Sequence, residues 1–111
     1  MIVALPQKLM TVDEFYEFVH QPENRYRVFE LVRGEVIELS RPNRVHGKIC
    51  ANTTYKLESF TRKRKKGYVV CNDTGVVLER DPDTVRGPDI GYYEDVQRFD
   101  DLPEKWGDTV P

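Results

Sequence analysis

The stretch "TVRGPDIGYYEDV", residues 84–96, gives the first indication of how this chain folds. Its valine, isoleucine and two tyrosines are typical of a β-strand, but Pro88 and Asp89 interrupt them. Proline offers no N–H to a strand ladder, and aspartate is depleted from strands. A kink or strand end at Pro88 would stop the pairing and direct Asp89 out of the ladder. We therefore interpret Asp89 as a candidate functional carboxylate.

A second carboxylate interrupts another apolar segment, "YRVFELVRGEVIELS", residues 26–40. The segment predicts two strands that turn at Arg33 and Gly34, where glycine supplies a positive φ. Because side chains alternate along a strand, Phe29 and Leu31 share one face. Glu30 falls on the opposite face, among the apolar or aromatic residues Tyr26, Val28 and Val32.

The remaining segments predict an α+β, α/β-like fold in which helices flank a mixed sheet. Thr11 and Glu14 form a capping-box pattern for a helix that ends near His20. A second helix is predicted over about residues 44–60, from the near-helical spacing of Val45, Ile49, Leu57 and Phe60. Residues 68–79, "YVVCNDTGVVLE", predict a further hairpin that turns near residues 72–75. "RDPD", residues 80–83, is a turn, and the segment after Tyr93 is predicted to be loop with at most one helical turn.

Composition sets the class of protein. A length of 111 residues favours a single domain, and 39% hydrophobic with 32% charged residues is typical of a folded globular chain. No apolar run is long enough to cross a membrane, and "MIVALPQKLM" does not fit a signal peptide, so we expect the cytoplasm. Cys50 and Cys71 are too few for a disulfide framework and are interpreted as two buried free thiols.

Charge is unevenly distributed. The net charge of −2 argues against strong nonspecific binding to nucleic acid, but residues 62–66, "RKRKK", form one basic run. Its members are Arg62, Lys63, Arg64, Lys65 and Lys66. Two interpretations remain open: phosphate contacts with release of counterions, or a solvated helix end whose cations suit the helix dipole.

The two strand carboxylates carry the candidate chemistry. A buried ionised carboxylate is costly unless a cation, hydrogen-bond donors or a metal compensates it. Mg²⁺ and Mn²⁺ prefer oxygen ligands and need few from the protein, so Glu30 and Asp89 would form part of such a site if they approach each other. Alternatively, Asp89 pairs with Arg86 or caps a turn, and Glu30 lies in an exposed register.

The ordered set "YRVFELVRGEVIELS", "RPNRVHGKI" and "VRGPDIGYY" resembles a family of small bacterial proteins, the putative restriction endonucleases of the PD-(D/E)XK nuclease superfamily. The resemblance runs from "MTVDEFYEF" to "DTVP" and covers the N-terminal portion of such a nuclease domain. It implies that Asp89 is the aspartate of the "PD" half-motif and that Glu30 is the early acidic residue. Both would be catalytic metal ligands for Mg or Mn in the hydrolysis of DNA phosphodiesters.

One part of the family pattern is missing. No second acidic residue followed by X and lysine comes on a strand after Asp89: "YYED" lacks the lysine, and Glu104 is directly beside Lys105. We therefore expect a C-terminally shortened member that binds metal weakly and cleaves little or no DNA. His46, in "VHGKI", is an accessory candidate that would orient a phosphate or assist metal-bound water; packing or capping is its alternative.

Two other interpretations differ in class. In one, the chain is a non-catalytic nucleic-acid-binding or assembly protein on a nuclease-like scaffold, which would bind DNA or a partner without metal. In the other, an exposed strand edge drives formation of a homo-oligomer.

Overall fold

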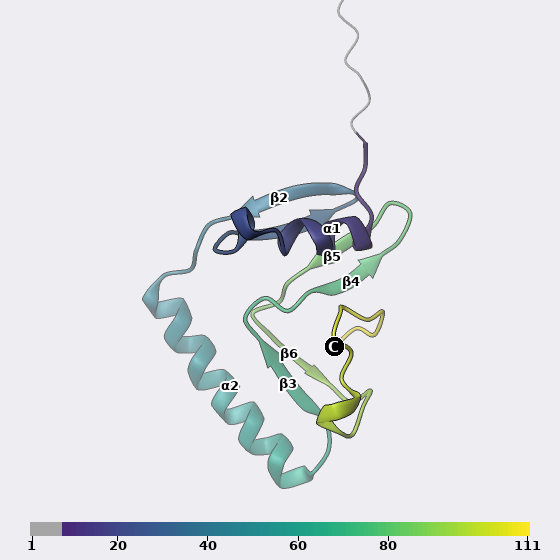
Figure 1. The fold of residues 1–111 in the computed structure, drawn as a ribbon. Coiled ribbons are helices and arrows are strands. Elements are labelled where there is room, and N and C mark those ends of the chain that lie inside the picture. The colour runs from purple at the N-terminus through teal and green to yellow at the C-terminus, as the bar shows by residue number, and fades with distance from the viewer. Residues whose placement is uncertain (1–7) are drawn as a thin grey trace, which may run out of the picture.

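The computed structural model describes residues 8–111, and Figure 1 shows the arrangement of its elements. In chain order these are α1 (Val12–Val19), β1 (Val28–Val32), β2 (Glu35–Leu39), α2 (Arg44–Arg64), β3 (Tyr68–Cys71), β4 (Val76–Glu79), β5 (Thr84–Arg86) and β6 (Ile90–Tyr93). Single 3₁₀ turns form at Pro22–Asn24 and Phe99–Asp101, the second of which is the one helical turn expected after Tyr93.

The strands form two sheets. One has four strands in the order β2-β1-β5-β4, and the other pairs β3 with β6. Every pair among the described residues is antiparallel, so the α+β class is confirmed but the single mixed sheet is not observed. The β1–β2 hairpin turns at Arg33 and Gly34 as predicted. Their φ angles of 49° and 82° give the two positive values that a tight hairpin turn matching strand twist requires.

The predicted hairpin over residues 68–79 is wrong. β3 pairs with β6, whereas β4 pairs with β5 across the predicted turn at residues 80–83. Asn72 and Asp73, with φ of 66° and 59°, carry the chain from one sheet to the other instead of folding it back. The segment 84–93 also divides, at residues 87–89, so that β5 joins the first sheet and β6 the second.

Helix α1 covers the four-stranded sheet (Figure 1) and closes the core. Its capping box is present: Thr11 Oγ1 accepts from Glu14 N–H at 3.2 Å, and Glu14 Oε1 accepts from Thr11 N–H at 3.1 Å. Asp83 Oδ2 accepts from Val12 N–H at 2.8 Å, which ties the β4–β5 turn to the helix start. The buried apolar cluster consists of Val12, Phe15, Leu31, Val77 and Val85.

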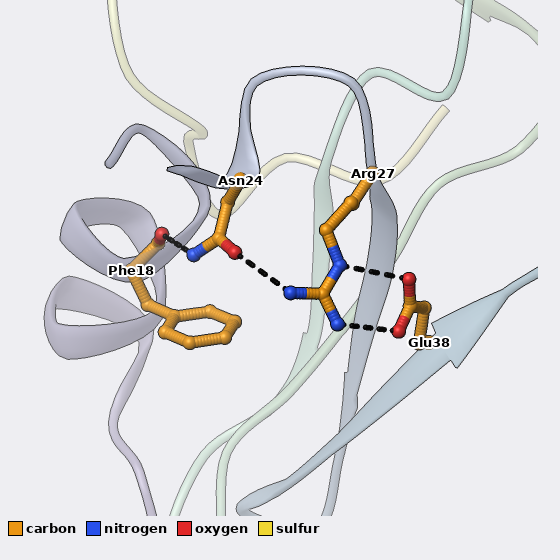
Figure 2. Close-up of polar contacts among 4 residues, drawn as sticks. All are labelled: Phe18, Asn24, Arg27 and Glu38. Atoms are coloured by element: carbon orange, nitrogen blue, oxygen red, sulfur yellow. Dashed lines mark hydrogen bonds and ion pairs between the residues drawn. The ribbon is translucent and has the colours of Figure 1, made fainter. Parts of the chain in front are cut away.

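A polar network closes the other end of α1 (Figure 2). The buried Asn24 side chain donates to the carbonyl of Phe18 at 2.7 Å and accepts from Arg27 Nη1 at 3.4 Å. Arg27 also donates to both oxygens of Glu38, at 2.9 and 2.6 Å. The network thus links the end of α1 to the start of β1 and to β2, and it adds a side-chain donor to a carbonyl at the end of the helix.

Helix α2 lies beside β3, away from the four-stranded sheet (Figure 1). Asn43 caps it by accepting from His46 N–H at 2.9 Å. The helix is longer than predicted because it continues through Arg62, Lys63 and Arg64, whose residue types are good helix formers. Of the predicted apolar stripe, Val45, Ile49 and Phe60 are exposed. The more buried face instead consists of His46, Cys50, Thr54, Leu57 and Thr61, at helical spacing. Within residues 8–111, no helix is long and apolar enough to cross a membrane.

Candidate metal centre

The two segments that cross from one sheet to the other, at residues 72–75 and 87–89, help to line a cleft. The β3–β6 register pairs Cys71 with Ile90, so Asp73 leaves the sheet at the same end at which Asp89 enters it. Helix α2 brings His46 and Cys50 to this end, and the resulting cleft has a volume of about 340 Å³. Asp89 is placed here because the strand is broken at Pro88, as the sequence predicted.

His46, Cys50 and Asp89 come together. Asp89 Oδ1 lies 3.1 Å from His46 Nε2, and Cys50 Sγ lies 3.4 Å from the same nitrogen. The three possible ligand atoms all lie within 4.8 Å of one another. The Asp89 side chain is 55% exposed and the His46 side chain 40%, so the cluster is open to solvent on one side. Asp89 does not form the alternative pair with Arg86.

Glu30 is buried beside this cleft, on the face of β1 that alternation predicts. Arg86 Nε donates to its Oε1 at 3.0 Å, and the N–H of Gly87 donates to its Oε2 at 2.9 Å. The alternative of an exposed register therefore does not hold. Glu30 fixes the last residue of β5 and the first residue of the segment that leads to Asp89.

Gly87 connects Glu30 to a third carboxylate, Asp73. A Cβ atom at Gly87 would lie 2.6 Å from the carbonyl oxygen of Asp73, so only glycine allows these two segments to approach so closely. Partial desolvation, followed by the negative charges of Asp89 and Glu30, raises the pKa of Asp73, while His46 acts in the opposite direction. The negative charges of Glu30 and Asp89 thus both act on the Asp73 carboxylate, and this concentration of negative charge favours a bound cation.

Two residues that line this cleft were missed by the sequence analysis. Asp73 was assigned to a hairpin turn, although an acidic residue shortly after the strand that ends at Cys71 was its available signal. Cys50 was interpreted only as a buried thiol, although it comes four residues after His46 and therefore lies on the same helix face. Cys50 is half-buried and Cys71 is exposed, so the prediction of two buried thiols is wrong for Cys71. Partial burial, then the negative charges of Asp89, Asp73 and Cys71, raise the pKa of the Cys50 thiol.

The donor atoms fit a divalent cation in two ways. The carboxylate oxygens of Asp73 and Asp89 are the ligand type that Mg²⁺ and Mn²⁺ prefer. Both oxygens of Glu30 already accept hydrogen bonds, so in this arrangement Glu30 adds negative charge and holds the backbone. The imidazole and thiol of His46 and Cys50 suit softer ions.

The basic run, residues 62–66, lies at the other end of α2, about 24 Å along the helix from His46. Arg62 pairs with Glu58 at 3.2 Å, and Arg64 and Lys66 approach Glu94 at 3.8 and 3.3 Å. Within residues 8–111, Lys63 and Lys65 form no ion pair, so they carry most of the free positive charge of the run.

A second basic surface adjoins the carboxylates and was not predicted. A cleft of about 370 Å³ shares Asp73 with the metal cluster's cleft and has four arginines in its lining: Arg25, Arg27, Arg41 and Arg86. Arg27 and Arg86 are engaged by Glu38 and Glu30. Arg41 donates one N–H to the carbonyl of Tyr26 at 2.7 Å and keeps its other donors available.

Comparison with known protein families identifies the family of this chain. The model of the Uma2 family, described as "Putative restriction endonuclease", matches residues 12–111. A search of curated proteins found no match.

Proposed function

Because the chain belongs to the Uma2 family of putative restriction endonucleases, we propose that it is a single nuclease-like domain of the PD-(D/E)XK type that acts on DNA with Mg²⁺ or Mn²⁺. One observation carries the proposal for the site. The strand break at Pro88 directs Asp89 into a cleft that Asp73 also lines, and the negative charges of Asp89 and Glu30 both act on Asp73. The proposed compartment is the cytoplasm, where free thiols such as Cys50 and Cys71 persist.

In this proposal each residue has a separate task. Asp89 holds the ion with Asp73 as its neighbour, and Glu30 keeps Gly87, and so the segment before Asp89, in place. When bound, a divalent ion supplies an activated water and stabilises charge on the leaving oxygen. His46 orients the Asp89 carboxylate and lies where it can accept or donate a proton at Nε2.

The basic surfaces support DNA as the substrate class. Arg25 and Arg41 line the cleft that adjoins Asp73, so a phosphate held by them would lie next to the carboxylates. Residues 62–66 would contact the DNA backbone farther along α2. Phosphate contacts of this kind make affinity fall steeply with salt.

Cleavage by this chain is expected to be weak or absent. Within residues 8–111 no strand follows β6, and Glu104 and Lys105 lie outside the strands, so the described residues supply no acid-X-lysine strand. This observation favours a second candidate function, a non-catalytic nucleic-acid-binding or assembly protein on the same scaffold.

Plasmid DNA distinguishes the two functions. The wild-type chain and Asp89→Asn are incubated with supercoiled plasmid in Mn²⁺, Mg²⁺ or EDTA, and binding is measured in parallel by fluorescence anisotropy. Metal-dependent nicking that Asp89→Asn abolishes supports the nuclease. Binding that is equally strong in EDTA, without nicking, supports the second function, and the absence of both overturns the two together.

Self-association also belongs to the proposal, because β2 is an edge strand with every residue exposed. Val36, Ile37 and Leu39 are among its exposed side chains, and such an edge offers unpaired backbone groups to a second copy. Light scattering after size exclusion tests this: a mass of a dimer or more supports it, whereas 13.0 kDa at high concentration contradicts it.

A further inference from the structure

We infer that His46, Cys50 and Asp89 form a binding site for a borderline-soft metal ion such as Zn²⁺. One coordination position of the ion would be open to solvent. The imidazole, thiol and carboxylate are three of the side-chain types that bind Zn²⁺. A hard ion that uses only carboxylates would leave the first two unused.

The helix presents two of the ligands together. His46 and Cys50 are four residues apart on α2, so their side chains lie one above the other on one face. The same spacing lets two histidines on a helix share a zinc ion. The capped start of α2 at Asn43 fixes the turn from which His46 projects.

The distances suit tetrahedral coordination. With bonds of about 2.0 to 2.3 Å, neighbouring ligand atoms around a tetrahedral Zn²⁺ lie roughly 3.3 to 3.7 Å apart. The observed separations are 3.1 Å between Asp89 Oδ1 and His46 Nε2 and 3.4 Å between Cys50 Sγ and His46 Nε2. The remaining separation is no more than 4.8 Å, so small side-chain rotations would complete the site.

Exposure leaves the fourth position free. Asp89 and His46 face solvent in part, and three protein ligands with an open position are typical of zinc sites at which water or substrate binds. Binding would require the Cys50 thiol to release its proton, as coordinated thiols do. Because the site uses Asp89, Zn²⁺ and the proposed Mn²⁺ would exclude each other.

Cobalt(II) tests the site because thiolate-to-cobalt charge transfer absorbs in the near-ultraviolet, and tetrahedral Co²⁺ absorbs strongly in the visible. The chain has two cysteines, so the band reports one of them. The full chain, kept reduced without thiol reagents, is titrated with Co²⁺ and then with Zn²⁺. We expect both absorptions to appear, and Zn²⁺ to abolish them.

Matched variants assign the ligands. Cys50→Ser should remove the charge-transfer band, and His46→Ala should weaken Zn²⁺ binding by about tenfold or more. Cys71→Ser and His20→Ala, which lie outside the three-residue group, should leave both unchanged. A band that survives in Cys50→Ser, or that is lost only in Cys71→Ser, overturns the inference. So does a wild-type spectrum of octahedral cobalt only.

The same variants separate this inference from the proposed function. A thiol is a poor ligand for a hard ion, so Cys50→Ser should retain Mn²⁺ affinity while it loses Co²⁺ charge transfer. Circular dichroism of each variant verifies that it is folded. If the wild type binds no Mn²⁺ but gives the expected cobalt spectrum, the result would contradict the nuclease proposal alone.

Discussion

Gly87 and Asp73 touch where the chain crosses twice between the two sheets: a methyl group at Gly87 would lie 2.6 Å from the Asp73 carbonyl oxygen. The neighbouring atom belongs to the backbone, so it cannot move aside cheaply. The N–H of Gly87 also donates to Glu30. Through these two contacts Gly87 holds Glu30 and Asp73 near each other and positions the segment that leads to Asp89.

Gly87→Ala should destabilise the fold by about 1 to 3 kcal/mol, because overpacking forces the two crossing segments apart. Gly47→Ala is the matched control, since nothing lies within 4 Å of a Cβ there. Gly47 is inside α2, so alanine should stabilise the chain by about 0.5 to 1 kcal/mol. Urea denaturation measures both, and equal stability of the two variants would contradict the tight contact.

Glu30→Ala should destabilise the chain by about 2 to 3 kcal/mol, because Gly87 N–H and Arg86 lose their acceptor in a mostly buried place. Exposure of about half of the Arg86 side chain keeps the loss below that of a fully buried pair. Glu30→Gln retains an acceptor and the side-chain volume, so it should cost less. If thermal or urea denaturation finds the glutamine variant as unstable as the alanine variant, the hydrogen bond to Gly87 is not the main contribution.

Asp83 makes stability depend on pH. It accepts from the N–H groups of Asp81 and Val12, and these bonds lower the pKa of its carboxyl. A lowered folded-state pKa gives stability that is fully present above the unfolded-state pKa and is lost as pH falls through the folded-state pKa.

Asp83→Asn should therefore be less stable than wild type by about 1 kcal/mol at pH 7, and the difference should shrink as the pH falls below the ordinary aspartate pKa of about 3.9. Urea denaturation at several pH values measures it. A difference that is constant from pH 7 to the acid limit would show that the Asp83 charge contributes nothing.

The basic run gives a salt-dependent prediction. Charge reversal at Lys63 and Lys65, the members without an ion pair in the described part of the chain, should weaken DNA binding and flatten its dependence on salt. Each lost phosphate contact should reduce the slope by about 0.9. Reversal of Arg62, which already pairs with Glu58, should have a smaller effect. Anisotropy titrations from low to moderate salt would show an unchanged slope if the run is only a solvated helix end.

Local signals predicted much of the fold. The Thr11 and Glu14 capping box, the turn at Arg33 and Gly34 and the strand break at Pro88 each depend on neighbours in sequence, and all three occur. The partner of β3 was predicted wrongly because turn-forming residues 72–75 suit a crossing between sheets as well as a hairpin. Pairing of β3 with β6 is set by tertiary contacts that no local pattern contains.

The site was predictable only in part for the same reason. Asp89 was found because it breaks a strand, and Glu30 because it interrupts an apolar face. Asp73 joins them only through the β3–β6 register, and Cys50 only through the packing of α2 against β3. The arginine-lined cleft combines segments that are distant in sequence, so composition gave no indication of it.

Calorimetric titration of Mn²⁺ into wild type, Asp89→Asn and the control Asp100→Asn tests the central claim most directly. Asp100 is an exposed aspartate in the second 3₁₀ turn, so its variant matches the change of charge without touching the cleft. We predict that Asp89→Asn remains folded and binds Mn²⁺ about tenfold or more weakly, while Asp100→Asn binds like wild type. Equal Mn²⁺ affinity in wild type and Asp89→Asn would contradict the assignment of Asp89 as a metal ligand.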